Sequence, residues 1–155
     1  MKKVKEGAKA PAFELCDKDG TKHALKSMKE KYVVLYFYPK DDTPGCTLEA
    51  KEFTADLKKY SKLKAAVIGV SGGDEKTKTK FCKKHDLDVL LLSDPDFEVA
   101  KAYESYGQKT FMGRKYMGIL RNTFVLDAKR KILKVFSAVK PEGHSAEVLA
   151  YLKSL

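Results

Sequence analysis

The sequence predicts an α/β fold in which helices flank a mixed β-sheet. Apolar, β-favouring runs alternate with segments of helical periodicity along the middle of the chain. Residues 32–38 are almost all apolar, which is typical of a central strand covered on both faces. Two strand-like runs and a helical pattern follow from residue 122 onward. With 155 residues, of which 43% are hydrophobic, the chain is expected to form a single domain over residues 1–155.

The first elements follow from alternation and turn composition. Residues 11–25 predict a short N-terminal hairpin, with a turn at residues 17–20. The polar residues 26–31 predict a turn or a short helix. The central strand comes next, and Pro39 ends it because proline has no backbone N–H for the ladder.

A helix is predicted over residues 43–60. Thr43 suits the N-cap, and Pro44 suits the first helical position. Leu48, Phe53 and Leu57 recur near helical spacing and are expected to pack inward. The later elements are a strand at 65–70, a helix from about Asp74 to His85, a strand at 87–92, a short helix opened by residues 93–95 and ending at Tyr103, a long loop or insertion at 108–118, a hairpin of strands 122–126 and 132–136, and a final helix starting at Glu142 or Ser145.

The charge pattern favours an ordinary solvated surface. The chain has 31 Lys and Arg against 21 Asp and Glu, a net charge of +10. The lysines are scattered, and no basic and aromatic patch stands out, so we expect no nucleic-acid partner. No apolar run approaches the roughly 20 residues of a membrane helix, and no apolar core follows the basic N-terminus. These features predict a cytoplasmic protein with no membrane contact.

Three cysteines, Cys16, Cys46 and Cys82, are the candidates for chemistry. Their odd and low number argues against a secreted disulfide scaffold, and there is no CxxC pair. The three histidines are dispersed, so neither a zinc finger nor an HExxH site can be built, and no metal site is predicted. Cys16 has no neighbour in sequence that would lower its pKa and is interpreted as structural.

Cys46 is the candidate nucleophile. It follows a buried strand and a proline-marked loop, at the N-terminus of a predicted helix, where N–H groups and the helix dipole favour a thiolate. Thr43 lies three residues earlier, so its hydroxyl can face the sulfur. The N–H groups of Gly45 and Cys46 can point into the same pocket, and Pro39 forms a rigid wall beside it. The simpler alternative is a cysteine that only packs at a helix start.

These residues carry a family resemblance. The spacing Pro39-x-x-x-Thr43-x-x-Cys46 is similar to the active-site motif of peroxiredoxins, and Thr43-Pro44-Gly45-Cys46-Thr47 is similar to the form found in the bacterioferritin comigratory protein (peroxiredoxin Q) subfamily. The likeness covers essentially the whole chain and includes the segment Arg121-Asn122-Thr123-Phe124. It implies a thioredoxin fold extended by an N-terminal β-hairpin and peroxiredoxin insertions.

The resemblance also implies roles. Cys46 would attack a hydroperoxide and become a sulfenic acid, with Thr43 bonding the sulfur and the peroxide. Arg121 would hold the thiolate and the developing oxyanion, a task that suits a planar, always charged guanidinium. Glu49 would orient Arg121 from one turn into the helix. No cofactor is implied, and the expected reductant is thioredoxin-like.

The residues determine less about the step that would follow formation of the Cys46 sulfenic acid. Many members of the subfamily carry another cysteine five residues after the first, but Lys51 stands there in this chain. Cys82 resembles the variant whose resolving cysteine lies on the following helix, and a disulfide with Cys46 would then require local unwinding. Two alternatives remain open: a one-cysteine peroxidase resolved by an external thiol, and a peroxide-sensing redox switch. The subfamily resemblance favours a monomer.

Overall fold

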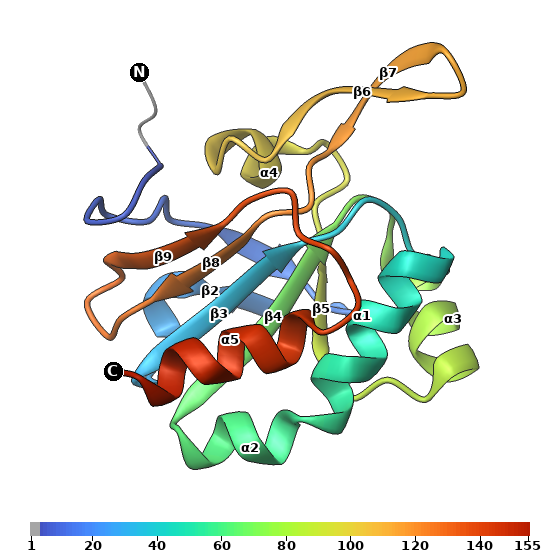
Figure 1. Ribbon diagram of the computed structural model, residues 1–155. Helices are drawn as coiled ribbons and strands as arrows, with labels where there is room; N and C mark the ends of the chain where they lie inside the picture. Colours follow the sequence, from blue (N-terminus) through green and yellow to red (C-terminus); the bar gives the residue numbers. More distant parts are fainter. Residues whose placement is uncertain (1–3) are drawn as a thin grey trace.

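A computed structural model of the protein describes residues 4–155, and a mixed sheet lies at its centre (Figure 1). Within these residues seven strands form the sheet in the order β2-β1-β5-β4-β3-β8-β9, and a separate two-stranded hairpin, β6-β7, projects from it. The strands are β1 (Glu14–Cys16), β2 (Lys22–Ala24), β3 (Tyr32–Phe37), β4 (Ala65–Ser71), β5 (Leu90–Ser93), β6 (Tyr106–Phe111), β7 (Arg114–Ile119), β8 (Thr123–Leu126) and β9 (Ile132–Phe136).

The helices cover both faces of the sheet. They are the 3₁₀ turn η1 (Leu25–Ser27) and the α-helices α1 (Pro44–Ala55), α2 (Leu57–Lys62), α3 (Glu75–His85), α4 (Glu98–Ala102) and α5 (His144–Lys153). In the part of the chain that the structure describes, no helix is both long and apolar enough to cross a bilayer.

The pairing of the central strands decides where the functional residues meet. β3 pairs in parallel with β4, and β4 pairs in parallel with β5, whereas β8 and β9 continue the sheet in antiparallel pairing. The carboxyl ends of the three parallel strands therefore lie at one edge, where ligand and catalytic groups gather in open α/β sheets. The loops after β3 and β4, which lead into α1 and α3, both begin at this edge.

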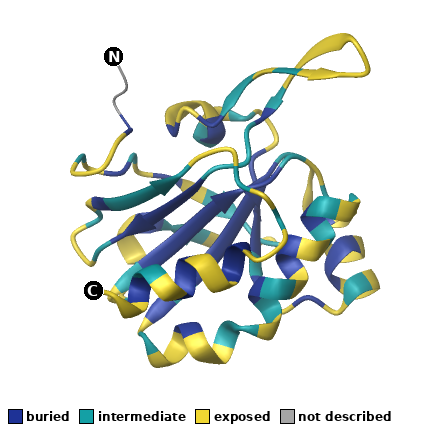
Figure 2. Cartoon of the chain, in the orientation of Figure 1, coloured by how far each residue is buried: buried dark blue, intermediate teal, exposed yellow. Residues whose placement is uncertain are grey.

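Two hydrophobic cores lie on opposite faces of the sheet, as the alternation along β3 requires. Val34 and Tyr36 face a core shared with α1, α2, α3 and α5. Val33, Leu35 and Phe37 face a second core shared with α4 and the N-terminal segment. Figure 2 shows the central strands dark blue along their length, which is the burial expected of a strand covered on both faces.

Most of the predicted order of elements is confirmed, including the N-terminal hairpin and the closing hairpin and helix. The helix predicted over residues 43–60 is wrong as a single element, because it breaks at Asp56. Asp56 ends α1 and starts α2, and its carboxylate accepts a hydrogen bond from Ser145 Oγ at 2.7 Å. The backbone of Asp56, at φ −98° and ψ 4°, leaves the helical region there, and its side chain bonds α5 and not the helix backbone. Leu48 is 40% exposed and does not pack inward.

The segment predicted as a loop or insertion at residues 108–118 is instead the β6-β7 hairpin. Its turn has Met112 and Gly113 in the left-handed region, which gives the tight reversal of a two-residue connection. The hairpin extends away from the sheet, so its apolar side chains Phe111 and Met112 are 67% and 87% exposed (Figure 2). Because most residues of the hairpin are exposed or only half-buried, the sequence shows no hydrophobic alternation there.

The strand predicted at residues 87–92 also starts later, because β5 begins at Leu90. The preceding amides of Asp88 and Val89 donate to Thr54 Oγ1 of α1, at 3.2 and 3.3 Å, and not to the sheet. Leu87 and Val89 are buried all the same, which explains why the apolar run is longer than the strand.

A glycine at the centre of the sheet gives the first prediction. A Cβ on Gly69 of β4 would lie 2.6 Å from Tyr36 Cζ and 2.7 Å from Leu91 Cδ2. Because both neighbours belong to packed strands, we expect Gly69→Ala to lower the free energy of unfolding by about 1–3 kcal/mol in urea denaturation. Gly107→Ala is the control, since its Cβ would meet Leu120 at an ordinary 3.5 Å. Equal stability of the two variants would contradict the predicted steric conflict.

Candidate active site

Cys46 lies at the start of α1, directly after the loop that leaves β3. Thr43 occupies the N-cap position with an extended backbone, Pro44 is the first helical residue, and the Thr47 N–H donates to the Thr43 carbonyl at 2.8 Å. The Cys46 side chain is in the first turn, and the residue is only 1% exposed. Its sulfur is thus near the positive end of the helix, where N–H groups have no intrahelical partner.

The guanidinium of Arg121 joins two side chains of α1. Its Nη2 donates to Cys46 Sγ at 3.4 Å, and its Nη1 donates to Glu49 Oε1 at 2.8 Å. The two acceptors are three residues apart on the helix and so share one face. A single planar group therefore contacts both at once.

Backbone pairing places Arg121 at this position. It lies just before β8, and the Phe37 N–H at the end of β3 donates to the Asn122 carbonyl at 2.9 Å. The Arg121 carbonyl in turn accepts from the Val139 N–H at 2.8 Å. The antiparallel register of β3 and β8 thus brings together residues that are 75 positions apart in sequence.

The charges of the site act on one another at short range. Burial raises the pKa of Glu49 to about 7, although the Arg121 guanidinium favours its charged form. Burial by itself would lower the pKa of Arg121, but the charges of Cys46 and Glu49 outweigh it and raise that pKa above its usual value. Arg121 is therefore a permanent cation beside a buried sulfur.

Gly45 leaves room for the guanidinium. A Cβ at this position would lie 3.3 Å from Arg121 Nη2 and 3.2 Å from Pro141 Cγ. The absence of a side chain lets Arg121 approach the first turn of α1 closely. Pro141 forms part of this wall and was not singled out from the sequence, because the segment before α5 carries no recognisable pattern.

The Thr43 hydroxyl does not donate to the Cys46 sulfur, although the sequence predicts that it faces this atom. Its Oγ1 donates to the Lys40 carbonyl at 3.0 Å, across the loop, so in this structure its proton does not point to the sulfur. Thr43 makes no side-chain cap bond to the helix either. Pro39 lies in the same loop and lines a cavity of about 450 Å³ together with Lys40, Asp41 and Asp42.

Cys82 lies on α3, apart from the Cys46 site, and both thiols are free. It is buried and borders a cavity of about 220 Å³ that is also lined by the turn of the N-terminal hairpin, including Lys18, and by Leu87. Burial raises the pKa of the Cys82 thiol. In this conformation Cys82 is thus a weak nucleophile, packed on a different helix from Cys46.

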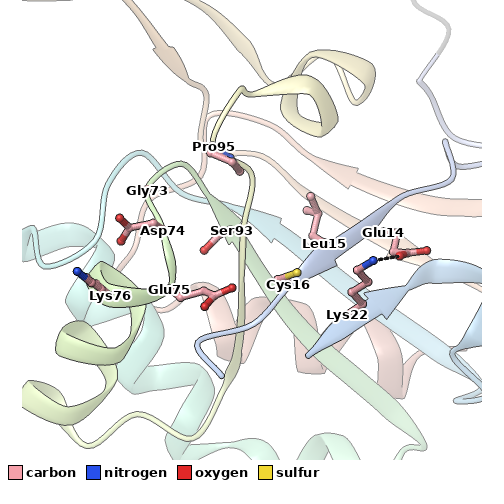
Figure 3. A pocket seen from close by; sticks show the side chains of 10 residues that line it. All are labelled: Glu14, Leu15, Cys16, Lys22, Gly73, Asp74, Glu75, Lys76, Ser93 and Pro95. Atoms are coloured by element: carbon pink, nitrogen blue, oxygen red, sulfur yellow. Dashed lines mark ion pairs between the residues drawn. The ribbon is translucent and has the colours of Figure 1, made fainter. Parts of the chain in front are cut away.

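Cys16 belongs to neither thiol environment. It lies on β1 opposite Ser93 of β5 and lines a cavity of about 530 Å³ whose far wall is the start of α3 (Figure 3). Cys46 is not among the residues that line this cavity. Its interpretation as a structural cysteine stays a prediction.

A second cation near the site was not predicted. Lys109 of β6 donates from Nζ to the Ile119 carbonyl at 3.1 Å. Burial lowers its pKa, and the charge of Arg121 lowers it further, whereas Cys46 acts in the opposite direction. Lys109 lies in the segment interpreted as a loop, where nothing in the sequence indicates that a lysine turns back toward the sheet.

Comparison with known proteins identifies the family. Residues 7–135 match the model of the AhpC/TSA family. Over 152 residues the chain is 43% identical to a protein named "Putative peroxiredoxin bcp" from Helicobacter pylori J99, with 98% of this chain and all of that protein covered. It is 41% identical to "Peroxiredoxin Bcp" of Bacillus subtilis, with 98% and 97% covered. The chain belongs to the AhpC/TSA family of peroxiredoxins, among the Bcp (PrxQ) proteins.

Solved structures agree with this assignment. A cysteine-to-serine mutant of Xylella fastidiosa PrxQ superposes with a TM-score of 0.93 at 32% identity, covering 99% of this chain and 98% of that one. Xanthomonas campestris bacterioferritin comigratory protein, described in terms of alkyl peroxide reduction, superposes with a TM-score of 0.87 at 35% identity, covering 92% and 89%. The fold of this peroxiredoxin is the thioredoxin fold, and its chemistry is thiol-dependent reduction of peroxides.

The buried Glu49 predicts a specific dependence of stability on pH. Its folded-state pKa of about 7 lies above the ordinary 4.5, so between these values the folded protein keeps a proton that the unfolded chain releases. Stability from this group is present at low pH and is lost as the pH rises through about 7. Relative to Glu49→Gln, the wild-type free energy of unfolding is expected to fall by about 3 kcal/mol between pH 4.5 and pH 8.

The measurement is urea denaturation of both proteins at matched pH values. The difference between them cancels the other titrating groups, because Gln keeps the acceptor for Arg121 and removes only the titration. A difference that stays constant with pH would show that Glu49 has the same pKa in the folded and unfolded states, so that its pKa is not raised.

Proposed function

We propose that this peroxiredoxin reduces hydrogen peroxide and organic hydroperoxides with Cys46 as the peroxidatic thiol. One observation carries the proposal: the buried Cys46 sulfur lies at the N-terminus of α1 with Arg121 Nη2 at 3.4 Å. The helix dipole and the guanidinium both stabilise a thiolate and a second negative charge developing next to it.

The first step transfers one oxygen atom. The Cys46 thiolate attacks the terminal peroxide oxygen, the O–O bond breaks, and sulfur keeps that oxygen and its hydrogen as a sulfenic acid. The remaining alkoxide or hydroxide takes up the proton that the thiol released and leaves as an alcohol or water. Sulfur is oxidised by two electrons and the peroxide is reduced by two. Arg121 stabilises the departing oxyanion, and Glu49 positions Arg121 through the 2.8 Å bond.

In the second step, Cys82 attacks the sulfenic sulfur of Cys46, a disulfide forms, and water leaves. Cys82 is buried on α3, and a disulfide requires Cα atoms within about 7 Å, so part of α3 or α1 has to unwind. Unwinding also exposes the Cys82 thiol and removes the burial that raises its pKa. Movement and activation of the resolving thiol are then the same event.

A dithiol donor of the thioredoxin class completes the cycle by thiol–disulfide exchange, which returns both cysteines to thiols and leaves the donor oxidised. Every side chain in the proposed cycle comes from one chain, in keeping with the expected monomer. We place the reaction in the cytoplasm, where such donors keep thiols reduced.

Mass mapping after one equivalent of hydrogen peroxide tests the proposal. Wild type is expected to yield a linked Cys46–Cys82 peptide, Cys82→Ser a sulfenic acid at Cys46, and Cys46→Ser no peroxide-dependent change. A free Cys82 beside an oxidised Cys46 in wild type would indicate the one-cysteine mechanism. Full peroxidase activity in Cys46→Ser would refute the main assignment, and oxidation without turnover by any donor would indicate a redox switch.

Replacing Arg121 by Lys tests the two-point contact. Lysine keeps the charge, but one ammonium cannot reproduce the fixed geometry of two N–H groups toward Cys46 and Glu49. We expect the rate constant for Cys46 oxidation to fall about 100-fold, the scale seen when an oxyanion donor is removed. The rate is measured by rapid quenching and sulfenic-acid trapping in a Cys82→Ser background. Arg114→Lys, on the exposed hairpin, is the matched control, and equal rates for both variants would rule out the proposed role.

A further inference from the structure

Two consecutive carboxylates connect the loop before Cys46 to both ends of α3. Asp41 Oδ2 accepts hydrogen bonds from Thr77 Oγ1 at 3.0 Å and from Lys78 Nζ at 2.9 Å, in the first turn of the helix. Asp42 Oδ2 lies 2.9 Å from Lys84 Nζ, in the last turn. Asp42 Oδ1 is 2.7 Å from Nε2 of His85, also in the last turn. We call these four contacts the α3 clamp.

The Asp41 end of the clamp is buried and fully bonded. Lys78 is 0% exposed, and its Nζ also donates to the Gly72 carbonyl at 2.7 Å and to Ser71 Oγ at 3.0 Å. The Tyr38 hydroxyl donates to Asp41 Oδ1 at 2.6 Å. Breaking one partner of such a buried pair leaves an uncompensated charge, so this end resists opening.

The Asp42 end is exposed and is anchored on a constrained backbone. Asp42 has a positive φ of 58°, a conformation that persists only when surrounding contacts hold it. The Lys84 side chain is 62% exposed and that of Asp42 is 41% exposed. The His85 side chain is 18% exposed and packs edge-on against Phe81, so solvent screens the Lys84 contact more than the His85 contact. Both contacts are more accessible than the buried Asp41–Lys78 pair, so this is the end that opens more easily.

Outside the clamp, Thr79 Oγ1 of α3 donates to the Lys18 carbonyl at 3.3 Å, and the Phe81 ring packs against Tyr38. The buried residues of α3 are Lys78, Phe81 and Cys82, so its apolar anchorage is small. Its first turn borders the cavity of about 530 Å³ drawn in Figure 3, and Thr77 and Phe81 border the cavity of about 450 Å³ behind Asp41. Cys82 borders the third, of about 220 Å³. Because the helix buries only Lys78, Phe81 and Cys82, polar contacts make up a larger share of what keeps it in place.

We propose that Asp42 and its partners Lys84 and His85 are positioning residues that set the rate of disulfide formation. Cys82 lies between the two anchor points, three residues before His85, so α3 has to fray from its last turn to release the thiol. Opening the Asp42 contacts frees this turn, while the buried Asp41–Lys78 pair keeps the first turn in place. The clamp then decides how long the Cys46 sulfenic acid waits for Cys82, and hence how much of it a second peroxide oxidises to sulfinic acid. This inference rests on the proposed function, since it needs Cys82 to be the resolving thiol.

The test compares two rates in the full-length protein. The double variant Lys84→Ala, His85→Ala removes both α3 partners of Asp42. Alanine is a good helix former, and Cys46, Arg121 and the loop sequence stay unchanged. After a pulse of hydrogen peroxide, quenched samples are mapped by mass for sulfenic acid, disulfide and sulfinic acid. Lys83→Ala, an exposed neighbour in the same turn, is the matched control, and Lys84→Arg tests rescue by a conservative change.

We expect the double variant to change the rate of disulfide formation and to leave the rate of Cys46 oxidation almost unchanged. Cys46 oxidation should stay within about twofold of wild type, while disulfide formation in the double variant should rise about threefold to tenfold, the scale of losing two polar pairs near the surface. The sulfinic fraction under excess peroxide should fall, and Lys83→Ala and Lys84→Arg should behave as wild type. Circular dichroism melting shows that the variants are folded.

The wild-type sample distinguishes failure of the clamp proposal from failure of the proposed function. An unchanged or slower rate of disulfide formation in the double variant, in a wild type that forms the Cys46–Cys82 bond, overturns the role of the clamp and leaves the proposed function intact. A wild type that forms no such bond overturns the proposed resolution step itself, and the clamp proposal with it.

Discussion

The contact of Arg121 with Cys46 and Glu49 is the interaction on which the rest of the site depends. One planar group bonds a sulfur and a carboxylate on the same face of α1, and this fixes where the helix starts relative to β8. Gly45 has to be free of a side chain for the guanidinium to fit, and the β3–β8 register has to bring Arg121 to the end of β3. Burial disfavours the charged form of Glu49 in this arrangement and raises its pKa to about 7 even beside the Arg121 cation.

A second buried pair joins Asp41, in the loop that carries Thr43, to Lys78 of α3. The Arg121–Glu49 pair joins the start of β8 to α1, which begins where that loop ends. The two pairs differ in what they connect. Arg121 joins the reacting sulfur to the rigid sheet, where small displacements are costly, whereas Asp41 and Asp42 join the loop to a helix that is bordered by cavities.

The sequence predicted what depends on short spacing and strong patterns. The buried run before Pro39, the N-cap position of Thr43 and the three-residue spacing from Cys46 to Glu49 all have local physical causes, and the structure brings Cys46, Glu49 and Arg121 together. Features that depend on tertiary partners were missed. The Thr43 hydroxyl turns to Lys40, α1 breaks at Asp56 through a bond to Ser145, and residues 108–118 form an exposed hairpin without a buried face. A buried Lys78 cannot be recognised in a helix with a polar, solvated pattern, because its charge partner Asp41 is 37 residues away.

The two steps of the proposed cycle make opposite demands on neighbouring parts of one fold. Peroxide reduction needs a sulfur, a cation and a helix start that do not move, and each of these is tied to the central sheet by backbone pairing or by a buried ion pair. Disulfide formation needs a buried thiol to leave its helix, and a helix anchored by two apolar side chains and several polar bonds meets that need without disturbing the sheet. Burial raises the pKa of the Cys82 thiol and so disfavours its thiolate until the thiol is exposed. In the proposed cycle the order of events then follows from packing: Cys46 would react in the closed structure, and Cys82 only after the last turn of α3 has opened.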